Sequence, residues 1–268
     1  MIGAKRLQRL RRISWALFSS QFAYMLEYRA EIALWALSGV LPLIMLALWQ
    51  GAAADQGLGL SYNQLSRYFI AAFVVRQFTV VWLIHVFEED VLQGKLSPLL
   101  LQPVHPLWRY FAAHVAEQAT RIPFVAVMLT LLAAIQANLM WWPGWSHLLL
   151  AVASIIWVFV LRFLLQSLIA MLCFWSERAA ALDRLMLIPY LFLSGLVAPL
   201  QFYPTWLQKL AACTPFPSMV AFPASLLAGE AANIGTGFAA LAGWCAVLLP
   251  ASMLMWIRGV RRYAAMGA

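Results

Sequence analysis

The stretch Phe87–Trp108, FEEDVLQGKLSPLLLQPVHPLW, separates two long apolar windows in a chain that is 64% hydrophobic and 10% charged. It has three consecutive acids after Phe87, and it contains three prolines and one glycine. Such a segment is too polar and too often broken to cross a bilayer as a helix. The leucines that follow Lys95 also make it too apolar for a solvated loop. The windows on both sides of this stretch indicate the fold class.

The apolar windows predict an all-α membrane protein. The mean hydropathy of +0.81 and the 64% hydrophobic content far exceed the roughly 45–50% apolar content of soluble domains. A membrane β-barrel would show short alternating strands instead. We expect six transmembrane helices, most of them close to the ~20 residues that a span needs, with a shorter fifth. The predicted spans cover residues 30–51, 65–86, 111–137, 148–175, 185–200 and 234–257.

The distribution of Lys and Arg predicts that both termini are cytoplasmic (N-in/C-in). In that orientation the outer loops contain only Lys209, with Arg67 just inside the second span, whereas thirteen basic residues lie on the inner side. Because these residues gather at the ends of spans, topology explains the net charge of +8 and excludes a nucleic-acid partner. The thirteen are Lys5, Arg6, Arg9, Arg11, Arg12, Arg29, Lys95, Arg109, Arg178, Arg184, Arg258, Arg261 and Arg262.

The chain divides into an N-terminal segment, 1–29, and a membrane domain, 30–268. In the first segment, apolar residues from Leu7 to Leu17 share one helical side, which predicts an amphipathic helix on the lipid surface. The membrane domain includes the inner loop 88–110 and a long outer segment, 201–233. The outer segment has four prolines among apolar residues, so we expect two short re-entrant helices that cover a transport path.

Several kinds of site are absent from the sequence. The only Gly-Lys pair, Gly94-Lys95, is followed by Leu96, and Glu89 stands where a phosphate-binding loop would have its first glycine. The four histidines and three cysteines show no metal-ligand spacing. We therefore expect neither a nucleotide nor any other cofactor in this chain.

Four charged residues fall well inside predicted spans, away from the span ends, where each is costly unless it faces protein or water. Glu117 and Arg121 are spaced i, i+4 and can pair on one face of the third span. Arg76 in the second span and Arg162 in the fourth have no obvious local acid. The four residues either contact an anionic or amphiphilic substrate or lock the bundle; the alternative is that they pair internally within the assembly, including with a partner chain.

The opening stretch joins the second and third spans on the inner side. We expect the three acids to end the second span, Gly94 to break the helix and Pro98 to begin a short new one. The apolar surface of that helix would consist of Leu96, Leu99, Leu100 and Leu101. Exposed leucines between helix breakers suit docking into a groove on another protein. A connector that rests on lipid is the alternative.

The run E-x-x-x-x-G-K-L-S-x-x-L-L-x-P from Glu89 to Pro103 resembles the first cytoplasmic loop of ABC-2 type (type V) exporter permeases. The similarity is greatest to the subgroup that pairs with a second, different permease and a daunorubicin-resistance-like ATPase. It implies that residues 90–102 form the coupling helix on the ATPase, which holds ATP and Mg²⁺. The implied coupling residues are Glu88, Glu89, Asp90, Gly94, Lys95, Leu96, Pro98, Leu99, Leu100 and Pro103.

The resemblance also implies an exporter subunit in the bacterial inner membrane, with two permease chains meeting through spans one and five. The chain itself would not be an enzyme. A self-contained secondary carrier or channel is the alternative, and it would favour an internal repeat and mid-membrane carboxylates. A membrane-embedded enzyme would need a nucleophile with a base, or a metal cluster. Lipid, peptide, polyketide and glycan substrates all stay open.

Overall fold

The computed structural model describes residues 2–28, 31, 34–35, 37–56, 61–135, 141–176, 179–231 and 233–265, and throughout these residues the regular structure is helical. Four helical stretches are long and apolar enough to cross a membrane, namely Tyr62–Leu92, Pro106–Ile135, Trp145–Phe174 and Ile234–Tyr263. At about 1.5 Å per residue, a 30-residue helix exceeds the hydrocarbon thickness of about 30 Å. Length and composition therefore confirm the predicted spans two, three, four and six.

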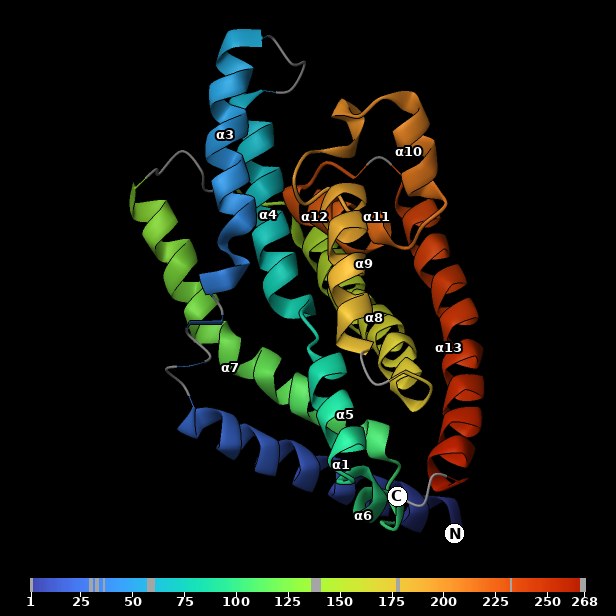
Figure 1. Ribbon diagram of the computed structural model, residues 1–268. Coiled ribbons are helices and arrows are strands. Elements are labelled where there is room, and N and C mark those ends of the chain that lie inside the picture. Colours follow the sequence, from blue (N-terminus) through green and yellow to red (C-terminus); the bar gives the residue numbers. More distant parts are fainter. Residues whose placement is uncertain are drawn as a thin grey trace.

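These spans correspond to α4 (Tyr62–Thr79) with α5 (Leu83–Leu92), α7 (Pro106–Ile135), α8 (Trp145–Ala170) with the 3-10 turn η3 (Met171–Phe174), and α13 (Ile234–Ala265). In Figure 1, α4 and α5 follow one another down the bundle with α8 and α9 beside them, while α7 and α13 flank the bundle. A capping box, in which the Ser61 and Gln64 side chains each accept from the other's backbone N–H, fixes the start of α4.

The first and fifth predicted spans differ from the other four. Helix α3 (Leu41–Gln56) follows the 3-10 turn η1 (Ser38–Val40), and parts of the predicted first span lie outside the described residues. Helix α9 covers Ala179–Leu193. It begins six residues before the predicted range 185–200 and ends seven residues before the end of that range, so both predicted ends were wrong. It ends early because Gly195 has a positive φ of 84°, which turns the chain. The count of six spans stays a prediction.

The segment after α9 packs back into the bundle. It forms η4 (Leu200–Phe202), α10 (Thr205–Ala212), α11 (Phe216–Met219) and α12 (Ala221–Ala228), which is three short α-helices rather than the two predicted. Met219, Val220 and Ala224 are buried in an apolar cluster with Val75 of α4 and Leu161 of α8. This burial shields irregular backbone next to the spans, as such backbone requires at membrane depth.

Helix α1 (Ile2–Glu27) lies across one end of the molecule, transverse to the long helices, and α6 (Leu96–Leu100) lies at the same end, while α10 lies at the opposite end (Figure 1). We call these the α6 end and the α10 end. Ile13 and Leu17 of α1 line a groove with Phe111 and Val115 of α7. The apolar side of α1 therefore contacts protein, and its position on a lipid surface stays a prediction.

Candidate functional site

The loop between α5 and α7 turns at Gly94, whose φ is 71°. The short helix α6 begins at Leu96 with Lys95 preceding it, so the expectation that Pro98 starts the helix was wrong. Pro98 is nevertheless in the first helical turn, where its missing N–H leaves no intrahelical hydrogen bond unmade. The loop thus contains one helix of five residues at the α6 end.

The four leucines of this loop do not form one exposed surface. Leu96 and Leu99 are 0% and 8% exposed, and they belong to a buried cluster with Phe87 and Phe174. Leu101 is 88% exposed, and Pro98 is exposed as well. The prediction that all four leucines are exposed was therefore wrong, because α6 uses one side to anchor itself to the bundle and leaves the Pro98 and Leu101 side open.

Each of the three acids after Phe87 has its own partner within the chain. Glu89 forms an exposed ion pair with Lys95, with 2.9 Å between Nζ and Oε1. Asp90 Oδ2 accepts a hydrogen bond of 2.6 Å from the Tyr110 hydroxyl of α7. Glu88 Oε2 accepts the backbone N–H of Ala180 at 2.6 Å, in the first turn of α9. The loop is thereby fastened to two other helices.

Glu88 also has a favourable electrostatic position. A carboxylate near the first turn of a helix interacts with the positive end of the helix dipole and accepts an N–H that has no intrahelical partner. On the other side of the loop, the Ser97 and Tyr263 hydroxyls lie 3.0 Å apart and connect α6 to α13. These hydrogen bonds connect α6 to α13 and α5 to α9.

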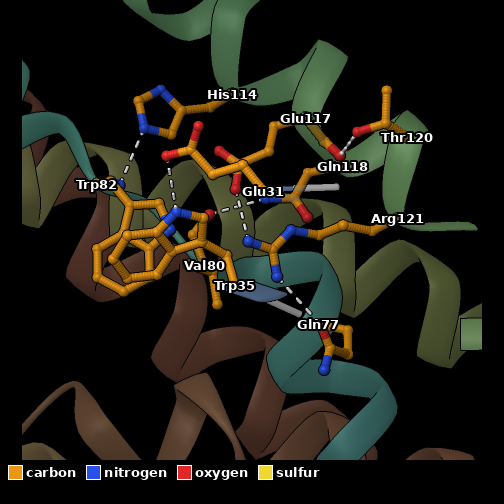
Figure 2. Close-up of polar contacts among 10 residues, drawn as sticks. All are labelled: Glu31, Trp35, Gln77, Val80, Trp82, His114, Glu117, Gln118, Thr120 and Arg121. Carbon is orange, nitrogen blue, oxygen red and sulfur yellow. Dashed lines mark hydrogen bonds and ion pairs between the residues drawn. The ribbon is translucent and has the colours of Figure 1, made fainter. Parts of the chain in front are cut away.

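A second group of polar residues surrounds a break in the second span. The chain is not helical at Val80–Trp82, between α4 and α5. Two side chains of α7 satisfy the freed backbone groups: His114 Nε2 accepts the Trp82 N–H at 2.9 Å, and Gln118 Nε2 donates to the Val80 carbonyl at 2.7 Å (Figure 2). Inside a membrane these hydrogen bonds replace the ones that a continuous helix would make.

The second ring nitrogen of His114 fixes its hydrogen-bonding role. Nδ1 lies 2.7 Å from the Tyr110 carbonyl, one turn earlier on α7. Because a carbonyl only accepts, Nδ1 bears the proton, and Nε2 is free to accept from Trp82. The arrangement requires a neutral imidazole at the break.

The predicted pair of Glu117 and Arg121 forms next to this break. Arg121 is 1% exposed, and it donates from Nη2 to Glu117 Oε1 and from Nη1 to Gln77 Oε1 at 3.1 Å. Figure 2 shows the guanidinium of α7 reaching toward Gln77 of α4. This pair therefore joins α7 to α4 and is internally neutralised, which agrees with the internal-pairing interpretation.

Arg76 and Arg162 have a different environment. Arg162 Nη1 donates to the Tyr190 hydroxyl of α9 at 2.7 Å, and its guanidinium carbon lies 4.6 Å from the centre of the same ring. Arg76 is within electrostatic range of both Tyr190 and Arg162. Among the described residues, no carboxylate is within ion-pair distance of either arginine. The structure thus separates the four intramembrane charges into one neutralised pair and two unneutralised arginines.

The sequence model of a family described as "ABC-2 family transporter protein" matches residues 58–267. The chain belongs to this family. The match contains the α5–α7 loop, the break at Val80–Trp82 and all four intramembrane charges. A search of curated proteins finds no match to the chain. ABC-2 membership agrees with a multi-pass transport subunit.

Sequence reasoning missed several residues of this ABC-2 chain. His114 and Gln118 were missed, although they precede the predicted Arg121 at intervals of four and three and share one face of α7 with it. That polar stripe in an apolar helix was a signal that the helix faces other polar groups. Tyr190 and Asp183 of α9 were also missed, and Asp183 Oδ1 accepts from Gln166 Nε2 at 2.9 Å. In the described part of the chain, no group of three His, Cys, Asp or Glu residues is arranged to hold a metal ion.

Proposed function

We propose that this ABC-2 chain is the permease subunit of an ATP-driven exporter in the bacterial inner membrane. It acts with a second permease chain and with ATPase subunits that hold ATP and Mg²⁺, and it moves an amphiphilic substrate outward. The observation that carries the proposal is the α5–α7 loop, which lies within the family match and presents an exposed surface at the α6 end.

The exposed surface of this loop would be the ATPase docking site. Its outer residues are Leu92, Lys95, Pro98 and Leu101, of which Leu101 is 88% exposed. A short apolar projection that is braced from behind suits insertion into a groove on a partner protein. The predicted coupling residues Leu96 and Leu99 would support this projection from inside the bundle, and Glu88 would transmit its displacement to α9.

Contacts to a second permease would use α3 and α9. Both helices have large apolar side chains that are unpacked in this chain, including Ile44 at 54% and Leu48 at 60% exposure on α3. On α9, Leu185 and Ile188 are 65% and 61% exposed. A different chain is the proposed partner, in line with the subgroup that the loop resembles.

Purification of the intact assembly through this chain tests the proposal. Native mass determination should find two permease masses and stoichiometric ATPase subunits. Two identical permease masses would contradict only the heteromeric arrangement. Absence of any ATPase, together with transport by the isolated chain in liposomes, would overturn the proposal in favour of a self-contained carrier or channel.

A further inference from the structure

Two arginines in the middle of the bundle approach the same tyrosine from different helices. Arg76 of α4 lies near the centre of the Tyr62–Leu92 span, and Arg162 belongs to the Trp145–Phe174 span. Arg162 donates to the Tyr190 hydroxyl at 2.7 Å, and Arg76 is within electrostatic range of both groups. Tyr190 itself is 7% exposed and belongs to α9. The three side chains thus form a small basic site between α4, α8 and α9.

This site is electrostatically incomplete. Two guanidinium groups within electrostatic range of one another repel in a low dielectric, and a charge within a span requires compensation by protein, water or a counter-ion. No described carboxylate lies within ion-pair distance of either group. The Nε atom of Arg76 is buried and has no hydrogen-bond partner in the described part of the chain.

Arg121 shows how the same chain treats a structural arginine. Its side chain is 1% exposed, and Glu117 and Gln77 accept from its two terminal nitrogens, so its charge is paired with a carboxylate even though its Nε, like that of Arg76, has no partner in the described part of the chain. Arg76 and Arg162 are both partly exposed instead. A charge that served only packing would be expected in the first arrangement. Part of each side chain is therefore accessible to a molecule outside the chain.

The surroundings of Tyr190 are apolar on the side that faces out of the chain. Met186 and Leu187, one turn before Tyr190 on α9, are 43% and 49% exposed. A ligand that met both features would need an anionic group for the guanidinium forks and an apolar body for α9. Guanidinium groups bind phosphate and carboxylate oxygens through paired N–H donors, which a neutral head group cannot match.

We propose that Arg76 and Arg162 bind the anionic group, phosphate or carboxylate, of the transported amphiphile beside Tyr190. This inference rests on the proposed function, and it narrows the substrate class from amphiphiles in general to anionic amphiphiles. An anion that lies between the two guanidinium groups would compensate their mutual repulsion. The apolar part of the substrate contacts the exposed face of α9.

Photolabelling of the purified intact assembly in nanodiscs tests the site. The probe is a dodecyl phosphate with a photoactivatable group near its phosphate, and labelled peptides are mapped by mass spectrometry. We expect labelling of peptides from α4, α8 and α9. Unlabelled dodecyl phosphate should compete at least tenfold better than dodecyl maltoside or dodecyltrimethylammonium. Equal competition by the three amphiphiles would overturn the inference, because it would indicate a site that selects only apolar chains.

Variants then connect the labelling to the arginines. Arg162→Gln and Arg76→Gln should each weaken displaceable labelling at least tenfold, whereas Arg109→Gln, an exposed arginine on α7, should leave it unchanged. Arg162→Lys keeps the charge but loses the fork, so it should give an intermediate loss even if a glutamine variant fails to fold. Unchanged labelling in folded Arg162→Gln and Arg76→Gln would refute the assignment.

The same preparations separate this inference from the proposed function. The variants should retain the ATPase and second permease, because neither arginine belongs to the loop at the α6 end. Arg162→Gln could instead dissociate the permease pair without affecting labelling. In that case the arginines form ion pairs with a carboxylate of the second permease, and the inference is wrong. If the ATPase is absent from the unsubstituted assembly while dodecyl phosphate still competes, the proposed function fails on its own.

Discussion

Replacing Leu101 by aspartate tests whether the exposed side of α6 binds the ATPase. The side chain is 88% exposed and lies outside the buried cluster. Its substitution should therefore change the free energy of unfolding by no more than about 0.5 kcal/mol, as is usual for exposed positions. If the leucine docks in a groove, its complete burial contributes about 1.5–3 kcal/mol to binding. Losing that contribution lowers affinity about ten- to hundredfold.

Leu99 supplies the matched control, because it lies two residues earlier, inside α6, which Leu101 follows directly. It is 8% exposed and contacts the cluster of Phe87 and Phe174. Leu99→Ala should lower the free energy of unfolding by about 2–5 kcal/mol because it leaves a cavity in a packed core. Its effect on the affinity of the folded fraction for the ATPase should be small. The two variants thus separate binding of the ATPase, which depends on Leu101, from packing of α6 against the bundle, which depends on Leu99.

The assay measures two quantities on each variant in nanodiscs: the thermal unfolding midpoint, and the affinity for the purified ATPase by surface-immobilised binding. We expect Leu101→Asp to keep the midpoint and lose affinity, and Leu99→Ala to do the opposite. Affinity within threefold of the unsubstituted chain for Leu101→Asp, at an unchanged midpoint, would refute docking through this side of α6.

Three further substitutions test the contacts that hold the site. Glu88→Ala should speed hydrogen exchange at the first turn of α9 and destabilise it by about 1–3 kcal/mol, while the amide of Glu88→Gln should retain part of the protection. His114→Phe removes the acceptor at the break and should cost about 1–3 kcal/mol in thermal unfolding; equal stability of His114→Phe and His85→Phe, an exposed control on α5, would contradict this. Glu117→Gln leaves the buried Arg121 charge uncompensated and should cost about 3–5 kcal/mol, and a double-mutant cycle with Arg121→Gln should show strong coupling.

Hydropathy predicted the four long spans because their apolar character is continuous over each window, and no tertiary contact is needed to recognise it. The break at Val80–Trp82 could not be predicted in this way. Its local sequence, TVVW at 79–82, contains neither glycine nor proline. The break depends on His114 and Gln118, which come from another helix and are adjacent only after folding.

The sequence could not predict which side of α6 faces the bundle, for a related reason. A helix of five residues shows barely more than one turn, so periodicity does not indicate which leucines face the bundle. The buried cluster decides this, because Leu96 and Leu99 contact residues distant in the sequence. The end of α9 was in principle predictable from Ser194-Gly195, since glycine commonly follows the last turn of a helix. That signal was outweighed by the apolar residues that continue to Leu200.

Helix α9 connects the proposed docking loop to the proposed anion site. Its first turn is held by Glu88, its second turn by Gln166 through Asp183, and its last turn by Arg162 through Tyr190. A helix of 15 residues is about 22 Å long, and Pro189, next to Tyr190, removes one of its intrahelical hydrogen bonds. Its two ends also pack into the apolar clusters of the bundle, whereas Leu185 and Ile188 between them are exposed within this chain. Under the proposed function, a displacement of the loop by ATP binding would reach Tyr190 through α9 and change its position relative to Arg162. Release of an anion from the two arginines would then follow from the same movement, because the tyrosine that orients one of them is part of the moving helix.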